Sequence, residues 1–145
     1  MTTIQSFEDI KAWQSAQILA TSIHKITSAE SFGHNRELRN QMQRAAISVM
    51  SNIAEGFERD GRKEFIYFLS IAKASAGELR SQLYLAIEMD HITKDEFHVM
   101  SSLAYETSRL IGGFINYLKS TSIPGTKFKA EHRGGASKKD DQERS

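Results

Sequence analysis

The sequence predicts an all-α fold, an antiparallel up-down four-helix bundle, and three observations support this prediction. The 145 residues contain one proline, Pro124, and proline interrupts helices more strongly than any other residue. Apolar residues recur at helical spacing in four long segments, whereas the alternation typical of strands is missing. The connections between these segments are short, which favours antiparallel neighbours. We expect residues 1–120 to form the bundle and residues 121–145 to form a disordered, mildly basic polar tail.

The first helix is expected to begin near Phe7. Ser6 can act as its N-cap, and Asp9 stands where the acid of a capping box belongs. Residues 28–34, which include Gly33, interrupt the pattern and predict the first connection. The apolar stripe of this helix consists of Ala12, Ala16, Leu19, Ile23 and Ile26.

The second helix is expected from about Arg36 to Phe57, with Asn35 as its N-cap. Its core-facing stripe consists of Leu38, Met42, Ala45, Val49, Ile53 and Phe57. Further apolar residues widen the arc to roughly 200°, so the helix needs a second partner besides its own core. These are Ile47, Met50 and Ala54. Small residues would let that partner approach closely, namely Ala45, Ala46, Ser48, Ser51, Ala54 and Gly56.

The third helix is expected from about Arg62 to Met89 and also has two apolar sides. Its core side consists of Phe65, Phe68, Leu69, Ala72, Ala76, Leu79, Leu83 and Ile87. Its second side consists of Tyr67, Ile71, Ala74 and Leu85, with Glu78 among them. A carboxylate on an apolar side needs a partner such as arginine, so we interpret Glu78 as part of an interface ion pair. Self-assembly would cover both second sides, and the alternative is a thick core within one bundle.

The fourth helix is expected to follow a capping box formed by Thr93 and Glu96 and to end near Lys119. Its apolar residues follow a heptad-like spacing. They are Phe97, Met100, Ala104, Thr107, Ile111, Phe114 and Leu118.

The composition argues against most kinds of catalytic site. There is no cysteine, and therefore no disulfide, zinc–thiolate site or cysteine nucleophile. Nucleophile-elbow and glycine-rich nucleotide-binding motifs do not occur. The first residues contain no apolar signal region, and no run approaches the roughly 18 apolar residues of a membrane span. We expect a cytoplasmic protein that is not an enzyme, binds no membrane and has no catalytic residues, metal or cofactor.

One alternative is a carboxylate–metal enzyme, because four-helix bundles host such centres. The required Glu-x-x-His motif occurs once, from Glu88 to His91, and no second copy is present. Its remaining ligands would be Glu55 and Glu78.

Binding to nucleic acid is a hypothesis based on where the basic residues lie. The net charge is only +1, but residues 121–145 carry six basic and four acidic residues. Acidic residues are interleaved with the basic ones of the second helix, which weakens this signal. The candidate nucleic-acid-binding residues are Arg36, Arg39, Arg44, Arg59, Arg62, Lys63, Lys127 and Lys129. A polar strip on the second helix is either a recognition surface or an ordinary solvated side, and consists of Glu37, Gln41, Arg44, Ser48, Asn52, Glu55 and Arg59.

Several motifs resemble the bacterial four helix bundle protein family, whose members include proteins encoded by intervening sequences of large-subunit ribosomal RNA genes. They occupy residues 7–14, 43–48, 52–57 (Asn-Ile-Ala-Glu-Gly-Phe), 63–69 (Lys-Glu-Phe-Ile-Tyr-Phe-Leu) and 78–79. The similarity covers about residues 7–119. It departs at residues 73–78, Lys-Ala-Ser-Ala-Gly-Glu, where the family tends to have Arg-Gly-Ser before the glutamate.

This resemblance implies a homopentameric ring. It also implies kinship with the accessory variability determinant of diversity-generating retroelements, which resembles a basic pentamer that binds reverse transcriptase and nucleic acid. We therefore expect a homo-oligomeric adaptor for RNA or DNA, with a reverse transcriptase as a further partner; the alternative is a protein-binding scaffold ring. The candidate oligomer-interface residues are Ile47, Met50, Ala54, Tyr67, Ile71, Glu78 and Leu85.

Overall fold

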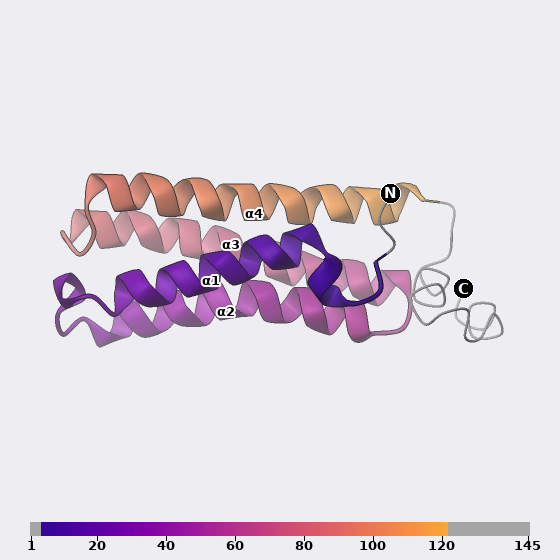
Figure 1. The fold of residues 1–145 in the computed structure, drawn as a ribbon, viewed down its shortest axis with the longest axis horizontal. Coiled ribbons are helices and arrows are strands. Elements are labelled where there is room, and N and C mark those ends of the chain that lie inside the picture. Colours follow the sequence, from indigo (N-terminus) through magenta and orange to yellow (C-terminus); the bar gives the residue numbers. More distant parts are fainter. Residues whose placement is uncertain (1–3, 122–145) are drawn as a thin grey trace.

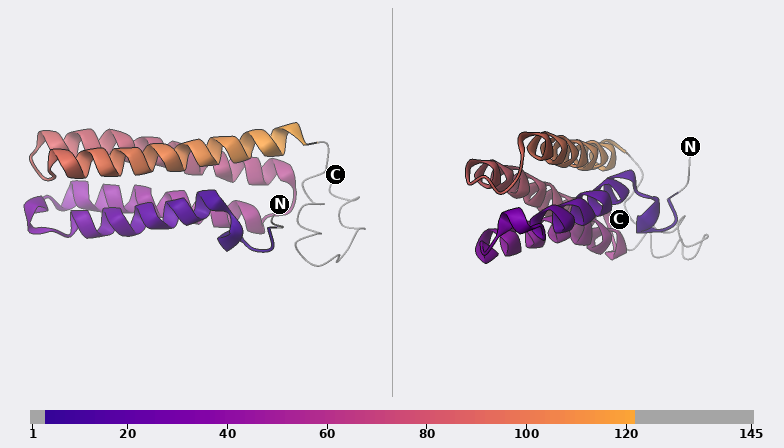
Figure 2. Two further views of the ribbon diagram at one scale, coloured as in Figure 1. Left: turned by 45° about the horizontal axis from the view of Figure 1, so that its top comes forward. Right: turned by 60° about the vertical axis from the view of Figure 1, so that its left-hand side comes forward.

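The computed structural model describes residues 4–121, and these form four long antiparallel helices (Figure 1). The helices are α1 (Lys11–Thr27), α2 (Arg36–Glu58), α3 (Arg62–Glu88) and α4 (Lys94–Ser120). A 3-10 turn, η1 (Phe7–Asp9), precedes α1, and a second one, η2 (Glu30–Phe32), precedes α2. Consecutive helices pack against each other, and α4 packs against α1 to close the bundle. Figure 2 shows the α1–α2 and α3–α4 hairpins as two layers. The predicted four-helix bundle is therefore confirmed, whereas the predicted tail beyond Thr121 lies outside the described residues.

The predicted caps of α2 and α4 are present. The Asn35 side-chain oxygen accepts a hydrogen bond from the Leu38 N–H at 3.2 Å. Thr93 and Glu96 form the reciprocal capping box, with side chain-to-backbone distances of 3.1 and 2.8 Å. These contacts satisfy N–H groups that have no partner within the helix.

The start of the first helix was predicted wrongly, because α1 begins at Lys11 rather than near Phe7. The predicted capping box of Ser6 and Asp9 is present, but it caps a separate 3-10 turn, η1; the Asp9 carboxylate accepts the backbone N–H groups of Gln5 and Ser6, at 2.8 and 3.2 Å. Ile10 then adopts an extended conformation, with φ −79° and ψ 121°, and its side chain is buried in the core.

The predicted apolar stripes form the core, which consists of two clusters along the bundle. One lies towards the end at which α1 begins and includes Val49, Phe57 and Leu69, and the other includes Leu19 and Leu79. Two details differ from the prediction for α3: Phe68 and Ile87 are only partly buried, whereas Ser75 and Ala86 are buried. Of α1–α4, no helix combines the length and apolarity needed to cross a membrane.

Two hydroxyl pairs lie where the two core clusters meet. Ser48 of α2 and Ser75 of α3 have their Oγ atoms 2.9 Å apart. Ser15 of α1 and Thr107 of α4 have their side-chain oxygens 2.6 Å apart, and Thr107 is fully buried. Buried hydroxyls need such partners, because an unsatisfied one costs about 1–3 kcal/mol.

Candidate interaction surface on helices α2 and α3

The outward-facing sides of α2 and α3 carry apolar side chains that the core does not cover. Exposed fractions are 53% for Ile47, 61% for Tyr67 and 49% for Leu85. We call this surface the outer α2–α3 face, consisting of Ile47, Ala54, Tyr67, Ile71, Ala74 and Leu85. Ala54 and Ile71 are partly buried, and so is Met50, whose side chain packs against the core. The arrangement thus leaves large apolar groups in water on two adjacent helices.

Several of the small residues of α2 bring α3 close rather than a second molecule. A Cβ atom on Gly56 would lie 2.8 Å from the Phe68 Cβ and 3.0 Å from a ring carbon of Phe65, so only glycine fits. Ser48 likewise faces Ser75. The interpretation of Ala45, Ala46, Ser48 and Gly56 as contacts for an oligomer partner is wrong. Ala45 and Ala46 are buried in the core of the same chain, and α3 fills the space beside Ser48 and Gly56.

The predicted polar strip of α2 is largely occupied by internal hydrogen bonds and ion pairs. Asn52 Nδ2 donates to the Ser48 carbonyl and lies 2.9 Å from the Ser48 Oγ. Arg44 lies 3.9 Å from the Glu78 carboxylate of α3 and also contacts Gln41. The partner expected for Glu78 is thus present within one chain. Both side chains of this pair are about half exposed or more, so it contributes little to stability.

The structure does not bring the candidate nucleic-acid residues of α2 and α3 together. Arg36 and Arg39 lie at one end of α2, and Arg59 lies at the other end beside Arg62 and Lys63. The two groups are about 30 Å apart along the helix at the standard rise. Arg44 lies between them, and Lys127 and Lys129 fall outside the described residues.

Besides Arg44, three more of these arginines have structural contacts. Arg39 donates to the backbone oxygens of Thr27 and Gly33, at 2.8 and 2.9 Å, and so holds the α1–α2 connection. Arg62 donates to the Thr121 carbonyl at the end of α4, at 2.7 Å.

The third, Arg59, pairs with Glu55 at 2.8 Å and with Glu64 at 3.8 Å, and it lies over the Phe68 ring at 5.0 Å. These contacts leave Arg59 less available to a phosphate than its exposure suggests.

His91, the potential metal ligand of the alternative hypothesis, joins three segments. Its Nε2 lies 2.9 Å from Asn35 Nδ2, its Nδ1 lies 3.1 Å from the Ser31 carbonyl, and its ring stacks on Phe32. Both ring nitrogens are therefore engaged. Within residues 4–121 no three histidine, aspartate or glutamate side chains are close enough to hold a metal ion.

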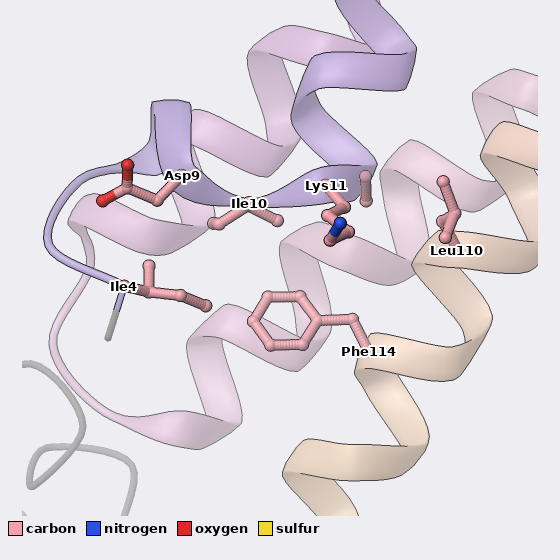
Figure 3. A pocket seen from close by; sticks show the side chains of 7 residues that line it. Ile4, Asp9, Ile10, Lys11, Leu110 and Phe114 are labelled. Carbon is pink, nitrogen blue, oxygen red and sulfur yellow. The ribbon is translucent and has the colours of Figure 1, made fainter. Parts of the chain in front are cut away.

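An apolar recess of about 300 Å³ lies between the N-terminal segment and α4 (Figure 3). Its lining consists of Ile4, Asp9, Ile10, Lys11, Ala12, Leu110 and Phe114. In Figure 3 the Phe114 ring extends from α4 towards Ile4 and Ile10. The charged groups of the lining are the Lys11 amine and the Asp9 carboxylate, which accepts the N–H groups of Gln5 and Ser6; the other lining side chains are apolar, so the recess suits an apolar group. Sequence patterns missed this recess because its two sides are about 100 residues apart.

Comparison with known protein families identifies one that matches most of the chain. The 23S rRNA-intervening sequence protein family matches residues 8–113, well over half of the sequence. The chain belongs to this family. The 23S rRNA-intervening sequence match spans α1, α2, α3 and most of α4, and with them the whole outer α2–α3 face.

A solved structure similar to this member of the 23S rRNA-intervening sequence family supports the fold. It is a protein of unknown function from the S23 ribosomal protein family of Bacteroides thetaiotaomicron, with a TM-score of 0.66 and 22% identity. The similarity covers 72% of this chain and 95% of the other. At this identity it shows a shared fold alone. A search of the curated proteins finds no match.

Proposed function

We propose that this chain is a non-enzymatic adaptor that assembles with itself and binds nucleic acid. The observation that carries the proposal is the outer α2–α3 face, where Ile47, Tyr67 and Leu85 stay about half exposed or more although the core is complete. Apolar groups gathered on adjacent helices are typical of protein interfaces. A closed symmetric assembly would remove them from water, and the family resemblance favours a pentameric ring.

Nucleic acid as a partner is supported by the family and by the basic residues that a ring would repeat. The family is named for an intervening sequence of 23S ribosomal RNA. Repetition of basic residues around a ring would also multiply their field and attract phosphate groups. By the same resemblance, a reverse transcriptase is the protein partner to test first.

The second candidate function is a protein-binding scaffold without affinity for nucleic acid. It is favoured by the internal contacts of Arg39, Arg59 and Arg62, which engage groups that would otherwise bind phosphate.

Two measurements test the proposal. Light scattering of the purified chain should give a mass that is a multiple of 16.4 kDa at micromolar concentration, and a 16.4 kDa monomer would contradict self-assembly. Titration with structured RNA at increasing salt should show affinity that falls steeply with salt. Absence of binding at low salt would reject the adaptor and leave the scaffold.

A further inference from the structure

Basic and aromatic side chains lie in a line along the surface where α3 meets α4, and within the described residues these side chains contact aromatic rings rather than carboxylates. Arg80 of α3 lies over the Tyr105 ring of α4, with 5.1 Å from its guanidinium carbon to the ring centroid. One turn along α3, Tyr84 packs edge-on against Phe97 of α4. Tyr84 and Tyr105 remain 63% and 53% exposed. Aromatic rings are thus presented to solvent beside a cation.

Lys73 continues the same line. It lies seven residues before Arg80, two full turns, and therefore on the same side of α3. A Cβ on Gly112 of α4 would lie 3.4 Å from the Lys73 Cε, so the lysine stem crosses towards α4. Lys119 lies seven residues after Gly112 and extends the line along α4. The side chains of Lys73, Arg80 and Lys119 are exposed and form no ion pair within the described residues.

Few acidic side chains lie on the parts of α3 and α4 that carry these basic and aromatic residues. Between residues 66 and 87 of α3 the only carboxylate is Glu78, which turns towards Arg44 of α2. Between residues 97 and 119 of α4 the only one is Glu106, which pairs with Arg109. The cations of the α3–α4 line therefore have no ion-pair partner within residues 4–121, whereas Arg44 and Arg59 each pair with a glutamate. Around Gly77, within the described part of the chain, no other side chain would approach a Cβ, so the surface there is open.

We propose that the α3–α4 line, formed by Lys73, Arg80, Lys119, Tyr84 and Tyr105, binds a single strand of RNA. Cations along a strip contact the phosphate backbone, and exposed tyrosine rings stack on bases that are free only in a single strand. The line from Tyr84 to Lys119 is about 27 Å long at the standard helical rise, enough for several nucleotides. This assignment rests on the proposed function, and it places RNA on a different side from the outer α2–α3 face.

The test compares charge variants of the whole chain by fluorescence anisotropy with a labelled oligouridylate of about 16 nucleotides. The variant Lys73→Gln/Arg80→Gln/Lys119→Gln should bind at least about tenfold more weakly at 50 mM salt, and its salt slope should fall by about 2, since each phosphate contact in a single strand contributes about 0.7. The matched control is Lys11→Gln/Lys25→Gln/Lys94→Gln, which removes three exposed charges elsewhere and should bind like the original chain.

A second variant tests stacking. Tyr84→Leu keeps an apolar contact with Phe97 but removes the aromatic face, so it should weaken binding without changing the salt slope. Circular dichroism melting should show that all of these surface variants fold. An RNA duplex should compete less well than the single strand; equal or better competition would overturn the single-strand assignment.

The outcomes separate this inference from the proposed function. If the original chain binds no RNA at low salt, both fail. If it binds RNA, and the α3–α4 variant binds equally well while Arg36→Gln/Arg44→Gln/Arg59→Gln does not, only the assignment to the α3–α4 line is overturned.

Discussion

The Oγ atoms of Ser48 in α2 and Ser75 in α3 lie 2.9 Å apart at the point where the two core clusters meet. Ser75 is only 8% exposed, so its hydroxyl depends on this partner. The pair is part of the close contact between α2 and α3. Gly56, eight residues further along α2, extends this contact towards the α2–α3 connection.

Replacing Ser75 by alanine should destabilise the chain by about 1 kcal/mol, the usual net value of one hydrogen bond. Ser48 keeps a contact with Asn52 in that variant, so the loss should stay modest. In urea denaturation, the double variant Ser48→Ala/Ser75→Ala should lose less than the sum of the single variants, because the two hydroxyls share one bond. Additive losses would show that the two hydroxyls act independently.

Gly56→Ala should destabilise the chain by about 1–3 kcal/mol, because the new methyl group would overpack against Phe65 and Phe68. Gly77→Ala is the matched control within α3: no neighbouring side chain among residues 4–121 obstructs its Cβ, and alanine favours a helix by about 0.5–1 kcal/mol over glycine. Urea midpoints should therefore move in opposite directions. Similar shifts for both variants would contradict the close contact at Gly56.

Asn35→Ala should cost about 1–2 kcal/mol, because it removes both the cap of α2 and the hydrogen bond to His91. Asn40→Ala, in the exposed part of the same helix, should change stability by less than about 0.5 kcal/mol. Thermal unfolding of the two variants compares them directly. Equal melting temperatures would mean that the Asn35 contacts contribute nothing.

Tyr67→Lys/Leu85→Lys should shift the assembly to smaller species, since a charge on the outer α2–α3 face opposes its burial. Ile18→Lys provides the control: Ile18 is 56% exposed on α1, away from that face, and its replacement should leave the mass unchanged. Light scattering after gel filtration measures both. A mass unaffected by Tyr67→Lys/Leu85→Lys would locate the interface elsewhere.

The number, order and approximate ends of the helices followed from the sequence because each apolar stripe depends on one helix alone. The stripe of α2 from Leu38 to Phe57 is buried throughout, as predicted. Local hydrogen-bonding groups also identified the caps at Asn35 and Thr93.

Features that join two helices could not be predicted in this way, because spacing within one segment does not fix how neighbouring helices are aligned. Lys73 lies against Gly112, and Ser48 faces Ser75, only because of the alignment the bundle adopts. The sequence correctly predicted that Tyr67 and Leu85 lie outside the core. It could not show that Gly56 provides space for Phe65 and Phe68 of α3. The basic residues in and just after α2 suggested a single cluster because they are close in sequence, whereas the structure spreads them along the length of the helix.

The packing of each helix on the next in sequence bears on how the chain reaches its fold. Three of the four helix contacts join segments linked by short connections, and only α4 on α1 requires distant parts of the chain to meet. Bundles dominated by such local contacts fold within microseconds to milliseconds. The α2–α3 hairpin, with its close contact at Gly56, is the natural nucleus. Separation of α1 from α4 is then the first opening expected in the native state, and amide exchange should be slowest in α2 and α3.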